Sequence, residues 1–164
     1  NTGEKEMFFQ IGAHPAFYWP DFEEAVQERG YFGFNKKDHL NYILISEKGC
    51  VDPFTEYPLV LTDGLLPLDT HTFDNDALII ENSQVKTVTL YNREKKAYLS
   101  LHFTTPVVGL WSPPGKNAPF VCIEPWYGRC DRTHYTGEYK DKDWMQHLQA
   151  GETFKGGYTI EINE

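Results

Sequence analysis

The chain has 164 residues, of which 40% are hydrophobic and 24% are charged, so its composition is that of one globular domain and excludes a disordered chain. Its net charge of -9 argues against nucleic acid and against an anionic membrane as partners, because both require an excess of Lys and Arg. No apolar run approaches the ~20 residues that span a bilayer, and no N-terminal stretch is typical of a signal peptide.

Cysteine and histidine spacing predicts neither a disulfide framework nor a metal site. The three cysteines, Cys50, Cys122 and Cys130, are odd in number and form no CxxC pair, which favours reduced thiols and a cytoplasmic location. The six histidines make no HxH, HxxxH or HExxH motif, and no phosphate-binding glycine loop is present. We therefore expect no metal and no cofactor.

Two short helices are predicted. The first covers residues 22–29, with Asp21 as its N-cap, Glu24 in the capping-box position and Gly30 at its end. The segment from Gly30 to Gly33 is interpreted as a turn. The second and weaker candidate covers residues 143–148.

Most of the remaining chain has the pattern of short strands. The 13 glycines and 10 prolines are spread along the sequence and leave little room for long helices. Residues 97–103 alternate strictly, with Leu99 and Leu101 on one face and Ser100 and His102 on the other. The fold class expected is all-β, an antiparallel β-sandwich. Its strands are expected at residues 41–46, 57–61, 77–80, 85–90, 97–103, 107–111, 120–123 and 157–162.

Glu124 ends an apolar strand and shares its face with Phe120 and Cys122. A carboxylate on such a face is costly unless it is paired or its pKa rises, and a partly desolvated carboxylate is suited to acid/base catalysis. The alternative is a structural ion pair with Arg129 or Arg132.

His14 precedes Pro15, which holds it in an extended conformation, and an aromatic run, Phe17 to Trp19, follows. Its imidazole titrates near neutral pH and can give or take a proton. The alternative is a core histidine beside a hydrophobic cluster. Asp74 and Asp76 precede the strand at residues 77–80, as turn residues or as side chains that project into a cleft.

Two segments, GAHPAF at residues 12–17 and PFVCIEPWYG at residues 119–128, together resemble the aldose 1-epimerase (galactose mutarotase) family, most closely its LacX-like branch. Further likenesses at residues 64–68, 73–80, 148–154 and 158–162 run in the same order over nearly all of the chain. The resemblance implies the family's antiparallel supersandwich. It also implies a small-molecule sugar, a hexose, as the binding partner.

The resemblance also implies roles for particular residues. His14 aligns with the general acid that protonates the sugar ring oxygen, and Glu124 aligns with the general base that takes the proton of the anomeric hydroxyl. Asp76 aligns with an aspartate that binds sugar hydroxyls. We expect Trp111 and Trp126 to form walls of the same cleft.

Chains of this family are longer, and this one begins close to the histidine motif. We therefore expect residues 1–164 to be the C-terminal part of a single sandwich domain whose N-terminal part is absent. The missing half or a second copy of the chain would complete the sandwich.

Other functions stay open. A non-catalytic carbohydrate-binding or sensing protein would use the same fold. A glycoside hydrolase would need a second carboxylate, for which Asp74, Asp76 and Asp131 are available. A phosphorylated sugar would need cationic partners such as Arg129 and Arg132.

Overall fold

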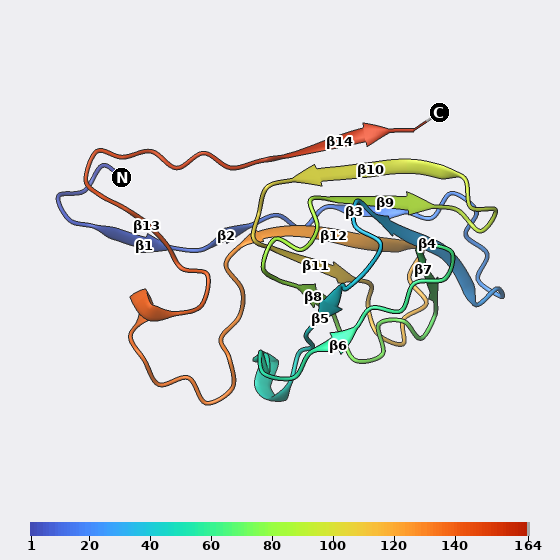
Figure 1. The fold of residues 1–164 in the computed structure, drawn as a ribbon, viewed down its shortest axis with the longest axis horizontal. Helices are drawn as coiled ribbons and strands as arrows, with labels where there is room; N and C mark the ends of the chain where they lie inside the picture. The colour runs from blue at the N-terminus through green and yellow to red at the C-terminus, as the bar shows by residue number, and fades with distance from the viewer. Residues whose placement is uncertain (164) are drawn as a thin grey trace.

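Two antiparallel sheets lie one over the other in the computed structural model, which describes residues 1–163 (Figure 1). Sheet I has five strands in the order β14 (Tyr158–Ile162), β10 (Ala97–Phe103), β9 (Thr87–Tyr91), β4 (Glu28–Phe34) and β7 (Leu65–Asp69). Sheet II has the order β2 (Ile11–Gly12), β12 (Phe120–Tyr127), β11 (Val107–Trp111) and β8 (Leu78–Ile80), and β3 (Ala16–Tyr18) also pairs with β12. The expected antiparallel sandwich is therefore confirmed.

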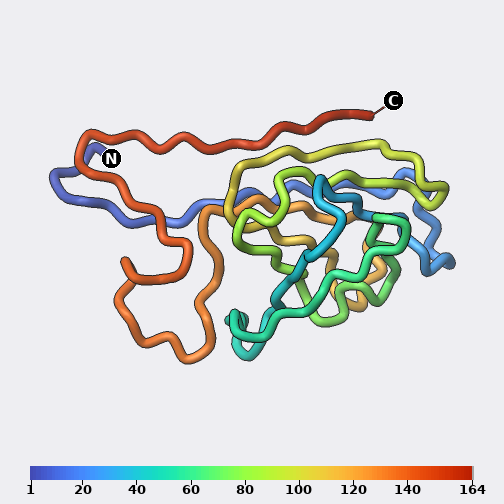
Figure 2. The backbone as a smooth tube through the Cα atoms, viewed as in Figure 1, coloured from blue at the N-terminus to red at the C-terminus, as the bar shows by residue number. Residues whose placement is uncertain are grey.

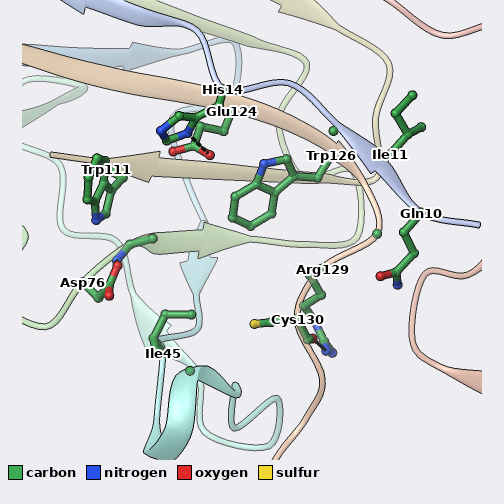
Figure 3. Close-up of a pocket in the computed structure, with 14 residues that line it drawn as sticks. Gln10, Ile11, His14, Ile45, Asp76, Trp111, Glu124, Trp126, Arg129 and Cys130 are labelled. Carbon is green, nitrogen blue, oxygen red and sulfur yellow. Dashed lines mark hydrogen bonds and ion pairs between the residues drawn. The ribbon is translucent and has the colours of Figure 1, made fainter. Parts of the chain in front are cut away.

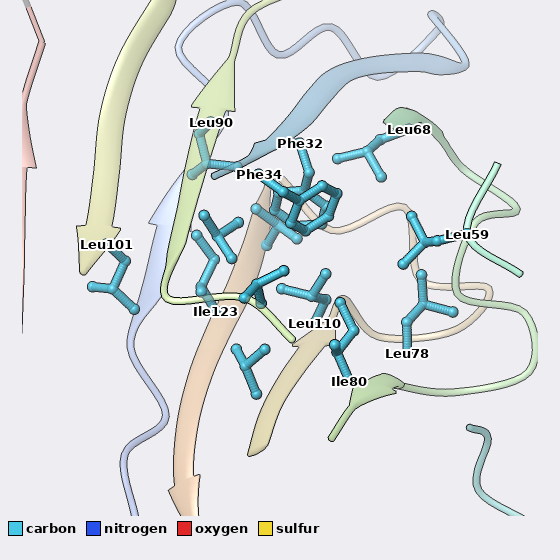
Figure 4. Close-up of a cluster of buried hydrophobic side chains, with 14 of the residues drawn as sticks. Phe32, Phe34, Leu59, Leu68, Leu78, Ile80, Leu90, Leu101, Leu110 and Ile123 are labelled. Carbon is cyan, nitrogen blue, oxygen red and sulfur yellow. The ribbon is translucent and has the colours of Figure 1, made fainter. Parts of the chain in front are cut away.

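The core lies between the two sheets, where each contributes alternate side chains. Phe32, Leu90 and Leu101 of sheet I meet Leu110 and Ile123 of sheet II, and all five are fully buried (Figure 4). Burial of such side chains stabilises a domain by about 1.5–3 kcal/mol each. The period of two in the sequence arises from this one-sided packing.

Most expected strands are found, with some differences in length. The strands at residues 97–103 and 107–111 have the predicted bounds. The strand expected at 120–123 continues to Tyr127 and so includes Glu124 and Trp126. The segments at 41–46 and 57–61 form only a short pair, β5 (Asn41–Tyr42) with β6 (Tyr57–Pro58).

The helix predicted at residues 22–29 is wrong, because this segment is a turn that leads into β4. Long-range contacts take the groups that a helix would use. The Asp21 carboxylate accepts the backbone N–H of Arg93 at 3.0 Å instead of capping a helix. The Arg29 guanidinium bonds to the Val26 carbonyl and lies 4.9 Å from the centre of the Phe22 ring.

The turn predicted at residues 30–33 is also wrong, because these residues form the middle of β4. The register of β4 shifts between Glu28 and Gly30, and Gly30 has a φ of 123°. A Cβ at Gly30 would lie 2.3 Å from the Tyr91 carbonyl oxygen. Here glycine marks an irregularity inside a strand and a close backbone approach rather than a turn.

The second predicted helix, at residues 143–148, is wrong as well. Its end forms β13 (Gln146–Leu148), which pairs with β1 (Met7–Phe9) at the other end of the chain. This two-stranded arm projects from the sandwich, and the first residues lie beside the segment near residue 150 (Figure 2). The N–H of Gly151 donates to the Asn1 carbonyl at 2.9 Å.

The outer face of sheet II carries a second apolar cluster. Ile43 and Val51, from the segment below the sheet, pack on Ile79 and Val107, with Trp126 at the border of the cluster. Part of the outer face of sheet II is therefore also buried, which explains the nearly continuous apolar runs of β11 and β12. The two one-turn 3-10 helices, η1 (Glu47–Gly49) and η2 (Tyr139–Asp141), lie in the loops around this face.

Two further features bear on the sequence-based expectations. The three cysteines, Cys50, Cys122 and Cys130, are free in the structure. Within residues 1–163, no helix has the length and apolar character needed to cross a membrane.

Candidate active site

Strand β12 places the candidate carboxylate by alternation. Val121 and Ile123 point into the sandwich core, so Cys122, Glu124 and Trp126 point to the outer face of sheet II. On the neighbouring strand β11, Gly109 lies directly opposite Glu124 in the antiparallel register. The same register places Trp111 opposite Cys122 and Val107 opposite Trp126.

His14 is fixed to the same strand by its flanking backbone. The N–H of Ala13 donates to the Pro125 carbonyl at 3.0 Å, and the N–H of Ile123 donates to the Pro15 carbonyl at 3.3 Å. These bonds hold the imidazole over β12, where its Nδ1 lies 2.5 Å from Oε2 of Glu124 (Figure 3). The two side chains that the sequence singled out therefore form a direct pair.

The pair is asymmetric in its exposure. The side chain of Glu124 is 8% exposed, whereas that of His14 is 62% exposed. Burial raises the pKa of Glu124 above its ordinary value of 4.5, the contacts with His14 and Trp126 oppose this in part, and the charge of Asp76 adds to it. A buried carboxylate with a raised pKa that touches a solvent-exposed imidazole is suited to exchange protons with a ligand.

An open cavity of about 630 Å³ lies against this pair. Its lining is mostly apolar and includes all five residues predicted from the sequence, His14, Asp76, Trp111, Glu124 and Trp126 (Figure 3). The size and the mixture of aromatic walls with a few polar groups are typical of a small-molecule site.

The three predicted binding residues approach the pair from different elements. The ring of Trp111 lies 5.7 Å from the His14 ring, centre to centre, at a tilt of 44°. Asp76, just before β8, has a φ of 70°, and its Oδ1 accepts the N–H of Ala77 at 2.7 Å. Asp74, the other aspartate considered, instead contacts Nδ1 of His71 at 2.9 Å and does not line the cavity.

The alternative in which Glu124 forms an ion pair with Arg129 or Arg132 is wrong. The Arg129 guanidinium lies at the cavity but donates to Glu81 at 2.5 Å and to Asp143 at 2.8 Å. The indole N–H of Trp144 also donates to Glu81, at 2.7 Å. This buried network fastens the segment after β12 to the end of β8, and it leaves Glu124 to His14.

Sequence reasoning missed several residues that line the cavity, namely Gln10, Ile11, Gly12, Ile45, Gly49, Ala77, Gly128, Arg129 and Cys130. Arg129 was considered only as a partner of Glu124 or of phosphate. The one available signal was the position of Gly128, Arg129 and Cys130 directly after β12, which ends at Tyr127. Ile45 and Gly49 come from a distant loop that no local pattern connects to β12.

One group among residues 1–163 has the donor types of a metal site. The ligand atoms of His14, Cys122 and Glu124 all lie within 4.8 Å of one another. However, burial raises the pKa of the Cys122 thiol to about 12, with the Glu124 charge adding to the effect. A metal ion at this group would have to displace that proton, which lowers the affinity of the group for a metal.

The fold and site have relatives among known proteins. Protein LacX (plasmid) from Lactococcus lactis subsp. lactis is 30% identical over 161 residues, which are 97% of this chain and 54% of LacX. The solved structure of a galactose mutarotase related enzyme from Lactobacillus acidophilus superposes with a TM-score of 0.85 at 29% identity, over 100% of this chain and 55% of that one. A galactose mutarotase-like protein from Lactobacillus casei ATCC 334 gives a TM-score of 0.77 at 23% identity, over 98% and 53% of the two chains.

The structural similarity shows that the sandwich has the galactose mutarotase-like fold. The chain is similar over nearly its whole length to LacX and to this galactose mutarotase related enzyme, which supports an aldose 1-epimerase-like, LacX-like family. It spans about half the length of the relatives it matches. No family model matches the chain.

The Arg129 network predicts a large loss of stability on substitution. Arg129→Met would leave the mostly buried Glu81 and the half-buried Asp143 without this buried cation, and we expect a loss of about 3–5 kcal/mol in the free energy of unfolding. Urea denaturation measures this. Arg132→Gln is the matched control, because Arg132 is more exposed and contacts Asp143 only at 3.5 Å, so its loss should cost about 0–1 kcal/mol. Equal effects of the two variants would contradict this interpretation.

The raised pKa of Glu124 predicts a pH-dependent cost of its charge. Between pH 4.5 and the raised pKa, Glu124 is protonated in the folded state and ionised in the unfolded state. The free energy of unfolding therefore falls as the pH rises through this range. Glu124→Gln lacks this titration. We expect the difference in urea midpoint, Glu124→Gln minus wild type, to become larger as the pH is raised from about 4 to about 8. A difference that decreases with pH would mean that His14 stabilises the carboxylate charge more than burial destabilises it.

Proposed function

We propose that this chain carries the acid/base pair of an aldose 1-epimerase, which interconverts the α and β anomers of a hexose. The observation that supports this most is the His14–Glu124 contact of 2.5 Å beside an open cavity with Trp111 and Trp126 in its wall. The likeness to a galactose mutarotase related enzyme supports the same reaction class. The proposal concerns residues in half of the length of the relatives, so the complete site would include further groups.

The reaction needs one transferable proton on the pair. In the starting state, His14 is protonated and Glu124 is charged. Glu124 takes the proton of the anomeric hydroxyl while His14 gives its proton to the ring oxygen, which breaks the C1–O5 bond and leaves the open-chain aldehyde. After rotation about C1–C2, the aldehyde oxygen takes the proton from Glu124, the attacking hydroxyl returns its proton to His14, and the ring closes as the other anomer.

The cavity walls suit a neutral sugar. Indole faces at Trp111 and Trp126 offer apolar surfaces for the C–H face of a pyranose, and Asp76 offers a carboxylate for its hydroxyls. The guanidinium of Arg129 is already bonded to Glu81, Asp143 and the Cys130 carbonyl, so it offers little to a phosphate. These features favour an unphosphorylated hexose.

Polarimetry of a freshly dissolved aldose tests the proposal. We expect the chain to accelerate the approach to anomeric equilibrium, and Glu124→Gln and His14→Asn each to reduce the acceleration by at least ~100-fold, the usual contribution of a positioned acid or base. His71→Asn is the matched control, because His71 forms a similar pair with Asp74 away from the cavity. Activity should also be lost at low pH, when Glu124 is protonated and can no longer act as the base. Because burial raises the pKa of Glu124, this loss should begin at a pH above 4.5.

Two outcomes would contradict the proposed mutarotase activity. The spontaneous rate with wild-type protein at matched buffer would exclude mutarotation by this chain. Sugar-dependent quenching of tryptophan fluorescence at that same spontaneous rate would instead identify the carbohydrate-binding alternative.

We also propose that the inner face of β14 is covered when the sandwich is complete. Ile160 lies opposite Leu101 and Ile162 opposite Leu99, so they point toward the side of the core, yet they are 44% and 71% exposed. Exposed apolar side chains on an edge strand are a surface for pairing. The remaining strands of the family or a second copy of this chain would cover them.

Sedimentation velocity tests whether a second copy of the chain covers the inner face of β14. For the 164-residue chain alone, we expect a dimer that forms with increasing concentration and that Ile162→Lys abolishes. Thr159→Lys, a substitution on the opposite face of the same strand, is the control that should retain the dimer. A wild-type monomer at all concentrations would exclude the second copy and leave the family's remaining strands as the cover.

A further inference from the structure

Trp126 lies flat on the outer face of sheet II because two neighbouring strands carry no side chain beneath it. A Cβ at Gly12 of β2 would lie 2.6 Å from Cδ1 of the indole. A Cβ at Gly109 of β11 would lie 2.6 Å from its Cη2 and 2.7 Å from its Cζ2. The five-membered ring therefore lies over Gly12 and the six-membered ring over Gly109.

Space, not backbone conformation, requires glycine at these two positions. Neither Gly12 nor Gly109 is among the glycines with positive φ, so alanine would fit the backbone at both. Each lies in a regular strand with an ordinary antiparallel register, Gly12 opposite Trp126 and Gly109 opposite Glu124. The three atoms nearest to a methyl group at Gly109 all belong to the six-membered ring of Trp126, at 2.6, 2.7 and 3.2 Å.

The position of Gly109 connects this packing to the candidate active site. Because Gly109 is the direct cross-strand neighbour of Glu124, no β11 side chain competes for the space beside the carboxylate. The indole occupies that space, lines the cavity and interacts with Glu124 itself. On its other side, Trp126 packs against the cluster that contains Val107.

We propose that Gly109 is a positioning residue: the absence of its side chain keeps the Trp126 indole flat, as the platform on which the sugar ring lies beside Glu124. The role in turnover rests on the proposed function, whereas the contact between Gly109 and Trp126 does not. A methyl group at Gly109 must push the ring about 0.8 Å into the cavity to restore an ordinary 3.4 Å contact. A displacement near 1 Å can cost about 100-fold in rate when it misplaces a substrate.

A double-mutant cycle separates this role from general damage to β11. We expect Gly109→Ala to lower kcat/KM for mutarotation by about 10- to 100-fold. In the Trp126→Phe background, the shorter side chain does not reach the added methyl group, so Gly109→Ala should change kcat/KM less than threefold relative to Trp126→Phe alone, the limit expected for uncoupled positions.

Two glycines serve as matched controls. Gly157→Ala adds a methyl group at ordinary φ with nothing within 4 Å, and it should leave kcat/KM unchanged. Gly33→Ala places a Cβ 2.6 Å from the Tyr91 ring in sheet I, away from the cavity. It should lower the urea midpoint while kcat/KM per folded molecule stays unchanged.

The outcomes are distinct. An equal loss from Gly109→Ala in both backgrounds would overturn the proposal, because the effect would not pass through Trp126. If Gly109→Ala does not fold, the double variant still decides: activity equal to that of Trp126→Phe supports the proposal, and loss of folding there as well overturns it.

A wild-type chain that shows only the spontaneous rate would defeat the proposed function instead. The same double-mutant cycle is then carried out with the affinity for galactose, measured by tryptophan fluorescence, in place of kcat/KM. A loss of at least tenfold for Gly109→Ala that disappears in the Trp126→Phe background would support the platform, and an equal loss in both would overturn it.

Discussion

Strand β12 imposes the constraint on which the rest of the site depends. Its alternate residues Val121 and Ile123 are fully buried between the sheets, so the strand cannot slip by one residue without moving them out of the core. The direction of Glu124 and Trp126 is thereby fixed by hydrophobic packing on the opposite face. A polar site is placed here by apolar residues that never contact a ligand.

The electrostatics of the site depend on which group each buried charge is paired with. The buried cation Arg129 is neutralised by Glu81 and Asp143, and the buried anion Glu124 is left with the exposed imidazole of His14. An arginine beside Glu124 would hold the carboxylate charged and lower its pKa. Because Arg129 is committed elsewhere, the proton affinity of Glu124 stays high. The network therefore leaves the raised pKa of Glu124 in place.

The sequence was sufficient for the features that depend on local pattern. Alternation identified β10, whose Leu99, Leu101 and Phe103 face the core, and a continuous apolar run identified β11, which is buried on both faces. The resemblance of two short motifs indicated that His14 and Glu124 belong to one site. The five predicted residues do lie around one cavity, and their roles stay predictions.

The failures have a common physical cause. Asp21 carries a good capping pattern, but Arg93 captures its carboxylate from 72 residues away. Gly30 and Gly33 suggested a turn, but close approach to Tyr91 requires them inside β4. Asp143 was assigned to a helix although it belongs to the Arg129 network. In each case a partner distant in sequence outweighed local propensity, which no local reading of the chain can detect.

The pairing of His14 with β12 also has a consequence for folding. Ala13 and Pro15, which flank the histidine, make backbone bonds to Pro125 and Ile123, and more than 100 residues separate the two segments. Contacts of such long range carry a large loop-closure entropy and slow the folding of β-proteins. During synthesis, His14 leaves the ribosome long before the strand that holds it. The His14–Glu124 pair therefore forms only after β12, more than 100 residues further along the chain, has been made, and no fragment that stops before β12 can contain it.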